Sequence, residues 1–164
     1  MSAAPWRVLG VDPGSARTGY GVVEGDGHEL RVVAFGCIET PPGLEAAPRL
    51  GMVYDGLKDL LRRYTPGAAA VEEIFFAKNA RTVIGVAQAR GVALLALGQA
   101  NIPVAEYTPL QVKVAVVGQG RAQKFQVQQM VALLLHLPEP PQPDDTADAL
   151  AVAICHLNRG QGGR

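Results

Sequence analysis

Several residue types that mark common functional sites are scarce in this chain of 164 residues. There are only two cysteines, Cys37 and Cys155, and neither lies in a C-x-x-C or C-x-x-H spacing, so neither a zinc site nor a disulfide is indicated. The three histidines are scattered along the chain and form no motif. Candidate chemistry must therefore be sought among the carboxylates and the basic residues.

The sequence also lacks the features of a membrane or exported protein. No uncharged apolar run approaches the roughly 20 residues that span a bilayer, and Met1 to Trp6 lacks a basic region followed by an apolar stretch. We therefore expect a cytoplasmic protein. Because there is no internal repeat or long linker, we expect one domain over residues 1–158 and a flexible tail over residues 159–164.

An excess of charge of one sign is missing too, since the formal net charge is zero. The charges are nevertheless unevenly distributed. Between Lys78 and Lys124 the only acidic residue is Glu106. The basic residues of this segment are Lys78, Arg81, Arg90, Lys113, Arg121 and Lys124. The segment predicts a basic surface that suits nucleic acid, although a solvated face without a partner explains the pattern equally well.

Hydrophobic periodicity predicts a mixed α/β fold. Three strands are expected first, over residues 6–11, 18–24 and 30–38, and short turns between them favour antiparallel pairing. Further strands are expected over residues 68–75 and 102–106, and helices over residues 44–64, 81–99, 110–117, 123–135 and 146–157. This order predicts a mixed sheet, three antiparallel strands followed by parallel strands, with helices on both faces.

An acidic residue follows the first predicted strand, and two more interrupt a later one. Asp12 comes where side chains at a strand's carboxyl end project toward a crevice, although an Asp before Pro-Gly is also a common turn former. Glu72 and Glu73 lie in an otherwise apolar run. Because strand side chains alternate, one of them faces inward or lies at the strand end. If the two strands are neighbours, the inward glutamate lies next to Asp12.

A further acidic group begins the last predicted helix. Asp145 and Asp148 are three residues apart, which places them on one face of the first helical turn, and Asp144 is positioned to serve as N-cap. Capping and the helix dipole explain one or two acids at a helix start. They do not explain Asp148, because the small apolar run over residues 149–153 is expected to face the sheet.

Carboxylates from two strand ends and one helix start would repel one another strongly if folding brought them together. Hard divalent cations relieve such repulsion, and Mg²⁺ takes oxygen ligands from one or two carboxylates plus a phosphate. Two ions roughly 3.5–4 Å apart activate a water on one side of a phosphodiester and stabilise the leaving 3′-oxygen on the other. The acidic residues therefore predict metal-dependent phosphodiester hydrolysis.

Five stretches occur in a fixed order along nearly the whole chain. They are Gly10-Val11-Asp12-Pro13-Gly14 with Thr18-Gly19-Tyr20-Gly21, Val71 to Asn79, Gln88 to Val92, Gln111-Val112-Lys113 with Val116-Val117-Gly118, and Asp145 to Ala151. Together they resemble the RuvC-type Holliday-junction resolvases. The resemblance implies a ribonuclease H-like fold with a five-stranded mixed sheet, a homodimer, and symmetric nicking of four-way DNA junctions with Mg²⁺ or Mn²⁺. It also implies a role in homologous recombination and DNA repair, and a partnership with a branch-migration motor complex (RuvA and RuvB).

Carried over residue by residue, the resemblance implies a metal-binding and catalytic set. The carboxylates are Asp12, Glu72, Asp145 and Asp148, and Lys113 is the further catalytic residue. Glu72 is preferred to Glu73 because the family's glutamate directly follows the aliphatic residue matched by Val71. Glu73 and Asp144 remain the alternatives within each pair of neighbouring acids.

The resemblance and the basic segment also indicate which residues contact DNA. Phe75 matches an aromatic that the family uses near the junction centre, where it can stack on an exposed base. A buried core position is the alternative for Phe75. Lys113 and Lys124 match basic positions that neutralise phosphates or transition-state charge. The expected DNA-binding set is Phe75, Lys78, Arg81, Lys113, Arg121 and Lys124.

Two other classes of protein are alternatives to a nuclease. Actin-like and sugar-kinase ATPases also have an Asp-x-Gly turn with a following Thr-Gly, but they need two such domains around the nucleotide, and this chain supplies one. A junction-binding scaffold that does not cut DNA would gain nothing from concentrating negative charge where phosphates approach. The sequence therefore favours a structure-selective endonuclease.

Overall fold

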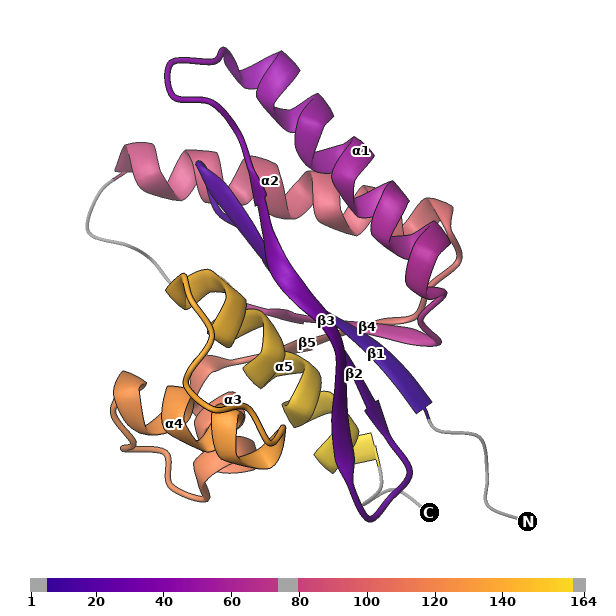
Figure 1. Cartoon of the computed structure of the whole chain (residues 1–164). Coiled ribbons are helices and arrows are strands. Elements are labelled where there is room, and N and C mark those ends of the chain that lie inside the picture. Colours follow the sequence, from indigo (N-terminus) through magenta and orange to yellow (C-terminus); the bar gives the residue numbers. More distant parts are fainter. Residues whose placement is uncertain (1–5, 74–79, 161–164) are drawn as a thin grey trace.

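A five-stranded sheet forms the centre of the computed structural model, which describes residues 6–73 and 80–160 (Figure 1). The strands are β1 (Trp6–Asp12), β2 (Arg17–Gly25), β3 (Leu30–Glu39), β4 (Ala68–Glu72) and β5 (Val104–Tyr107). Their spatial order is β3-β2-β1-β4-β5. The first three strands pair antiparallel, and β4 and β5 run parallel to β1, as the sequence predicted.

Helices cover both faces of this sheet, which also confirms the prediction (Figure 1). One layer consists of α1 (Ala46–Tyr64) and α2 (Ala80–Gln99). The other consists of α3 (Pro109–Val117), α4 (Lys124–Leu134) and α5 (Asp144–Gly160). Helix α5 crosses the middle of its face and packs on β1, β2 and β4.

Strand alternation divides the core into two clusters, one on each side of the sheet. On β4, Ala68 and Ala70 face the α5 layer, whereas Ala69 and Val71 face α1 and α2. The small β4 side chains let both helical layers approach this strand closely. Glu72 continues the Ala68 and Ala70 face, so its side chain lies on the side of the sheet that α5 covers.

Some element bounds differ from those predicted. The apolar run over residues 68–75 was expected to be one strand, but β4 ends at Glu72, and residues 74–79 lie outside the described part. Helix α5 continues through Arg159 and Gly160, which the sequence assigned to the tail. Asp144 is the first residue of α5, and its carboxylate accepts a hydrogen bond from the Gln128 amide at 3.1 Å instead of serving as the expected N-cap.

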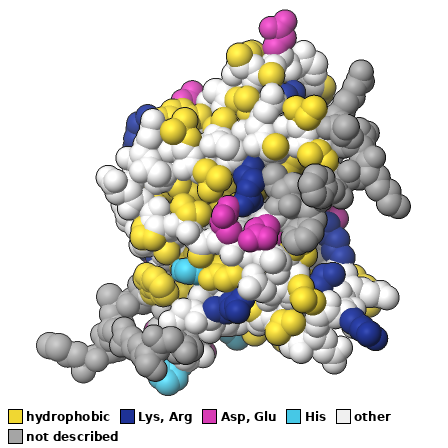
Figure 2. Space-filling view, turned by 180° about the vertical axis from the view of Figure 1, so that it is seen from behind, with side chains coloured by type: hydrophobic (Ala, Val, Ile, Leu, Met, Phe, Trp, Pro, Cys, Tyr) yellow, Lys and Arg dark blue, Asp and Glu magenta, His cyan; other side chains and the backbone are white. Residues whose placement is uncertain are grey.

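Helix α2 carries an unusually apolar surface. Its segment Thr82–Gln99 matches a membrane span by length and composition, with a mean hydropathy of 1.2, but only 28% of it is buried inside the protein. Ile84 and Leu95 are 60% and 54% exposed. Hydrophobic side chains are spread over the upper part of the face in Figure 2, where α1 and α2 lie in Figure 1. Such an uncovered apolar face is typical of a contact with another molecule.

Candidate active site

The sheet places two acidic residues side by side at one edge. Asp12 is the last residue of β1, and Glu72 is the last residue of β4. Val11 pairs with Val71 in the parallel β1–β4 ladder, so each acid follows directly after the final paired position. Parallel strands end at the same edge of a sheet, and the two side chains therefore project into the same crevice.

Helix α5 brings two further carboxylates to this edge. Asp145 and Asp148 lie in its first turns, on the face toward the sheet. The helix backbone lies close against β1 and β2 because glycines stand beneath it. A Cβ on Gly10 would lie 1.9 Å from the carbonyl oxygen of Ala149, and a Cβ on Gly19 would lie 2.1 Å from that of Asp145. Any larger residue there would push the helix away from Asp12.

Three of the carboxylates form a compact cluster. One ligand oxygen from each of Asp12, Asp145 and Asp148 lies within 4.8 Å of the other two. Burial is the largest cause, and together with the charges of Asp148, Asp145 and Glu72 it raises the pKa of Asp12 to about 8. Burial also raises the pKa of Glu72 and of Asp148. The folded chain thus holds several carboxylates where their negative charge is unfavourable.

This donor set fits a divalent cation. Mg²⁺ and Mn²⁺ prefer oxygen ligands, and carboxylates at this spacing can share an ion between them. A bound cation would also supply the opposite charge that restores the ordinary acidity of Asp12. Asp12, Asp145 and Asp148 would hold such an ion, with Glu72 at the adjoining strand end as a further ligand.

Basic side chains lie beside the cluster but neutralise it only in part. Lys124 Nζ lies 3.5 Å from a carboxylate oxygen of Asp148 and 3.5 Å from one of Asp144. Desolvation lowers the pKa of Lys124, but these two ion pairs outweigh it and leave the pKa raised, so the ammonium group stays charged. Arg17 Nε lies 3.9 Å from Asp145. Burial, and not any of these cations, has the largest effect on the pKa of Asp12.

Two of the acidic residues, Glu72 and Asp148, line a cleft of about 280 Å³. Lys113 and Lys124 line the same cleft. A cleft that joins carboxylates to cations can hold a phosphate near a metal ion.

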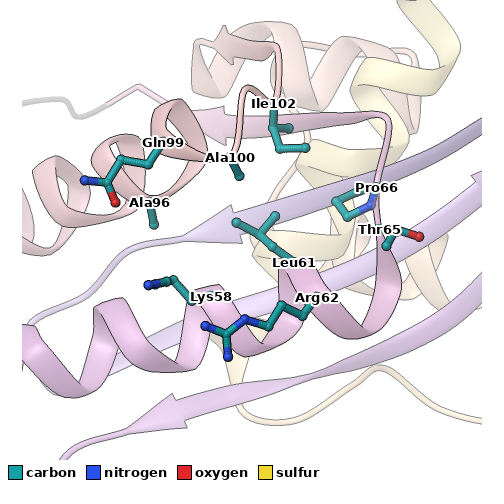
Figure 3. A pocket seen from close by; sticks show the side chains of 9 residues that line it. All are labelled: Lys58, Leu61, Arg62, Thr65, Pro66, Ala96, Gln99, Ala100 and Ile102. Atoms are coloured by element: carbon teal, nitrogen blue, oxygen red, sulfur yellow. The ribbon is translucent and has the colours of Figure 1, made fainter.

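A larger cleft of about 520 Å³ lies between the carboxyl-terminal parts of α1 and α2, and Figure 3 shows the side chains around it. Its lining contains Lys58 and Arg62 but no carboxylate, and it borders Pro66 at the opposite end of β4 from Glu72.

The remaining predicted residues are distributed as follows. Glu73 is exposed just beyond β4, and Asp144 is exposed on the far side of Lys124. Arg121 is exposed before α4. Phe75 and Lys78 lie outside the described residues, and so does the side chain of Arg81. The structure therefore brings together the four predicted carboxylates with Lys113 and Lys124.

Arg90 does not belong to the basic surface that the charge pattern suggested. Its guanidinium pairs with Glu106 on β5 and donates to the backbone carbonyl of Glu72. Counting charges along the sequence could not reveal this ion pair, because Glu106 is a single acid among six basic residues between Lys78 and Lys124. The glycines beneath α5 were also missed as site residues. The sequence did contain one indication of their role: Gly19 and Gly21 are two residues apart and so lie on the same face of a strand. Small residues on one strand face permit the close approach of a helix.

Comparison with known proteins identifies close relatives. A family described as crossover junction endodeoxyribonuclease RuvC matches residues 8–156. The crossover junction endodeoxyribonuclease RuvC of Desulforamulus reducens is 58% identical over 149 residues, which is 91% of each chain. The protein of the same description from Chloroflexus aggregans is 57% identical over 150 residues, or 92% of each chain.

Solved structures agree with these sequence matches. The structure described as T. thermophilus RuvC in complex with Holliday junction substrate superposes with a TM-score of 0.91 at 38% identity, over 96% of both chains. The yeast mitochondrial Holliday junction resolvase Ydc2 shares the fold, with a TM-score of 0.66 at 12% identity. The ribonuclease H-like fold class expected from the sequence is confirmed.

Proposed function

Because the chain belongs to the RuvC family of crossover junction endodeoxyribonucleases, we propose that it resolves four-way (Holliday) DNA junctions by hydrolysing phosphodiester bonds. The observation that carries this proposal is the cluster of Asp12, Asp145 and Asp148 oxygens within 4.8 Å of one another, of which Asp148 also lines a cleft that contains Lys113 and Lys124. We place this activity in homologous recombination and DNA repair, in the cytoplasm, with residues 1–158 acting as one nuclease domain.

Asp12, Glu72, Asp145 and Asp148 would hold two Mg²⁺ or Mn²⁺ ions. When bound, the ions supply a water nucleophile activated at neutral pH and charge stabilisation for the leaving 3′-oxygen. The protein's own contribution is to fix the carboxylate oxygens before DNA arrives. It does so by seating α5 on the glycines of β1 and β2, so that little reorganisation is needed when the phosphate binds.

The basic residues orient the DNA. Lys113 and Lys124 line the cleft and would hold the scissile phosphate, and Lys113 would also stabilise charge that develops on it. Arg121, exposed before α4, would contact the DNA backbone further away. We also propose that Phe75, Lys78 and Arg81 contact DNA. This assignment is based on the sequence alone.

A second copy of the chain would cover the apolar face of α2. The exposed stripe on this helix consists of Ile84, Ala87, Gly91, Leu95 and Gly98. These positions recur at intervals of three, four or seven residues, so they form one face, and Gly91 and Gly98 have open space where a Cβ would lie. We propose that two α2 helices pack here and produce a homodimer with two active sites. Partnership with the RuvA and RuvB motor complex is proposed from family membership.

The test is a cleavage assay on a synthetic four-way junction beside a linear duplex of the same sequence, with Mg²⁺ and Mn²⁺ in turn. Paired nicks in the junction, and none in the duplex, are expected from the wild-type chain. Asp12→Asn should reduce the rate at least roughly a hundredfold, since even outer-shell changes at metal sites cost 10–100-fold, and should leave junction binding intact. Binding without cleavage by the wild-type chain in either metal would instead indicate a scaffold.

A further inference from the structure

Arg90 connects helix α2 to the strand ends that carry the acidic site. Its guanidinium donates one hydrogen bond to the backbone carbonyl of Glu72 and forms an ion pair with Glu106. The Arg90 side chain is only 13% exposed, whereas Glu106 is 45% exposed. Charge-assisted hydrogen bonds are stronger when they are shielded from water, so the Arg90 contact with the Glu72 carbonyl is well placed to hold the backbone.

Among the residues that the structure describes, few other contacts restrain the backbone at the end of β4. Its ladder with β1 ends at the pair Val11 and Val71, one residue before Glu72. On the other side, the Glu73 N–H donates to the Tyr107 carbonyl of β5 at 2.7 Å. Glu72 is therefore held by the β5 ladder and by Arg90, at the point where the strand leaves the sheet.

The contact of Arg90 is with the backbone of Glu72 and not with its carboxylate. Within residues 6–73 and 80–160, the charges that act on the Glu72 carboxyl group are those of Asp148, Lys124 and Lys113. Arg90 therefore reaches the acidic site through the position of the main chain. A backbone displacement at Glu72 would move its carboxylate away from Asp12, with no change in the neighbouring charges.

We infer that Arg90 is a positioning residue for the metal ligand Glu72: by binding the Glu72 carbonyl and the Glu106 carboxylate together, it fixes where β4 ends relative to β5 and α2. This inference rests on the proposed function, because it takes Glu72 as a ligand. Lys cannot replace Arg fully, since a single ammonium group lacks the planar fork that reaches two acceptors in fixed directions.

The experiment measures Mn²⁺ binding by calorimetry, without DNA, for the wild type and for Arg90→Ala, Arg90→Lys and Glu106→Ala. Arg90→Ala should weaken Mn²⁺ binding about tenfold or more, as loss of a supporting residue does at other metal sites. Arg90→Lys should retain part of the affinity. Glu106→Ala should lose less than Arg90→Ala, because it leaves the bond to the Glu72 carbonyl. The metal concentration for half-maximal junction cleavage should shift in parallel.

Val92→Ala is the matched control, since Val92 is a partly buried residue of the same helix in the core cluster of α1 and α2. It should lower the melting temperature and leave Mn²⁺ binding unchanged. The inference is overturned if Arg90→Ala binds Mn²⁺ like the wild type, if Val92→Ala loses the same affinity, or if Glu106→Ala loses as much as Arg90→Ala. If Arg90→Ala does not fold, the comparison of Arg90→Lys with Val92→Ala decides. A wild-type chain that binds no Mn²⁺ would instead contradict the proposed function.

Discussion

Gly19 of β2 lies directly beneath Asp145 of α5: a Cβ added to Gly19 would lie 2.1 Å from the Asp145 carbonyl oxygen and 3.0 Å from the Asp145 Cβ. The backbone of β2 therefore packs on the backbone of α5 at the point where the helix brings the Asp145 carboxylate to the cluster. Gly19 also pairs with Asp12 across the β1–β2 ladder. The absence of one side chain thus allows the Asp12 and Asp145 carboxylates to meet.

Replacement of this glycine should disturb the metal site more than the fold. Gly19→Ala is expected to lift the start of α5 and to weaken Mn²⁺ binding at least about tenfold, with a proportional loss of junction cleavage. The control is Gly21→Ala on the same face of β2, where the added Cβ would meet the Leu150 side chain. Gly21→Ala should lower stability and change Mn²⁺ affinity little. Equal metal affinities for the two variants would contradict this role of Gly19.

The stability of the metal-free protein should fall as the pH rises from about 4 to about 8. Asp12 has a folded-state pKa of about 8 against an ordinary 3.8, so the folded chain binds the proton more tightly than the unfolded chain over this range. The raised pKa values of Glu72 and Asp148 act in the same direction.

Asp12→Asn removes the Asp12 contribution, so in EDTA at pH 8 the variant should melt at least about 3 °C above the wild type, because each kcal/mol shifts Tm by roughly 2–4 °C at this size. With saturating Mn²⁺ the order should reverse, because only the wild type gains binding energy. Calorimetric scans from pH 5 to pH 8 measure both effects. An Asn variant that melts at or below the wild type in EDTA at pH 8 would show that the Asp12 charge is not unfavourable.

Lys124 should lower the pKa of the neighbouring Asp148 carboxyl group. Its ammonium group pairs with Asp148, and this pairing opposes the burial that raises the pKa of Asp148. In Lys124→Ala the rising limb of the cleavage-rate profile should shift to higher pH, by up to roughly 0.7 pH unit for a partly exposed pair, and the rate should fall. Lys58→Ala, which removes the same charge at the distant cleft of Figure 3, should leave the profile unchanged. Identical profiles for all three proteins would exclude this role.

A charge on the apolar stripe of α2 should separate the two subunits. Leu95→Glu places a carboxylate in the proposed interface and should convert the protein to monomers in light scattering at micromolar concentration, because a buried unpaired charge is costly. Leu133→Glu on α4 is the control, since Leu133 is equally large and 68% exposed but lies on another helix. Dimers that persist in Leu95→Glu, or dissociate only in Leu133→Glu, would place the interface elsewhere.

The sequence predicted the sheet and the acidic residues well, because both depend on local patterns. Alternation within strands and the turn after Asp12 are visible along the chain, and the antiparallel pairing of the first three strands follows from their short connections. The placement of Glu72 beside Asp12 depended on one tertiary assumption, that β4 lies next to β1, and the structure has this arrangement.

The contacts that position the site could not be predicted in the same way. Arg90 and Glu106 are 16 residues apart and lie on different elements, so their pairing requires knowledge of how α2 crosses β5. The close approach of Gly19 to Asp145 joins residues far apart in the chain, and a glycine in a strand is compatible with a bulge or a turn as well. Such contacts depend on how the elements pack in three dimensions. Composition and periodicity do not specify any single contact of this kind.

The central claim is that Asp12, Asp145 and Asp148 together hold a divalent cation that cleavage requires. Anomalous diffraction from a Mn²⁺-soaked crystal of the wild-type protein tests it most directly. The account predicts a Mn²⁺ peak at bonding distance, roughly 2.0–2.3 Å, from the Asp12 carboxylate and from at least one of the α5 carboxylates, and its loss in Asp12→Asn. A peak elsewhere, or none under conditions in which the enzyme cuts junctions, would contradict it.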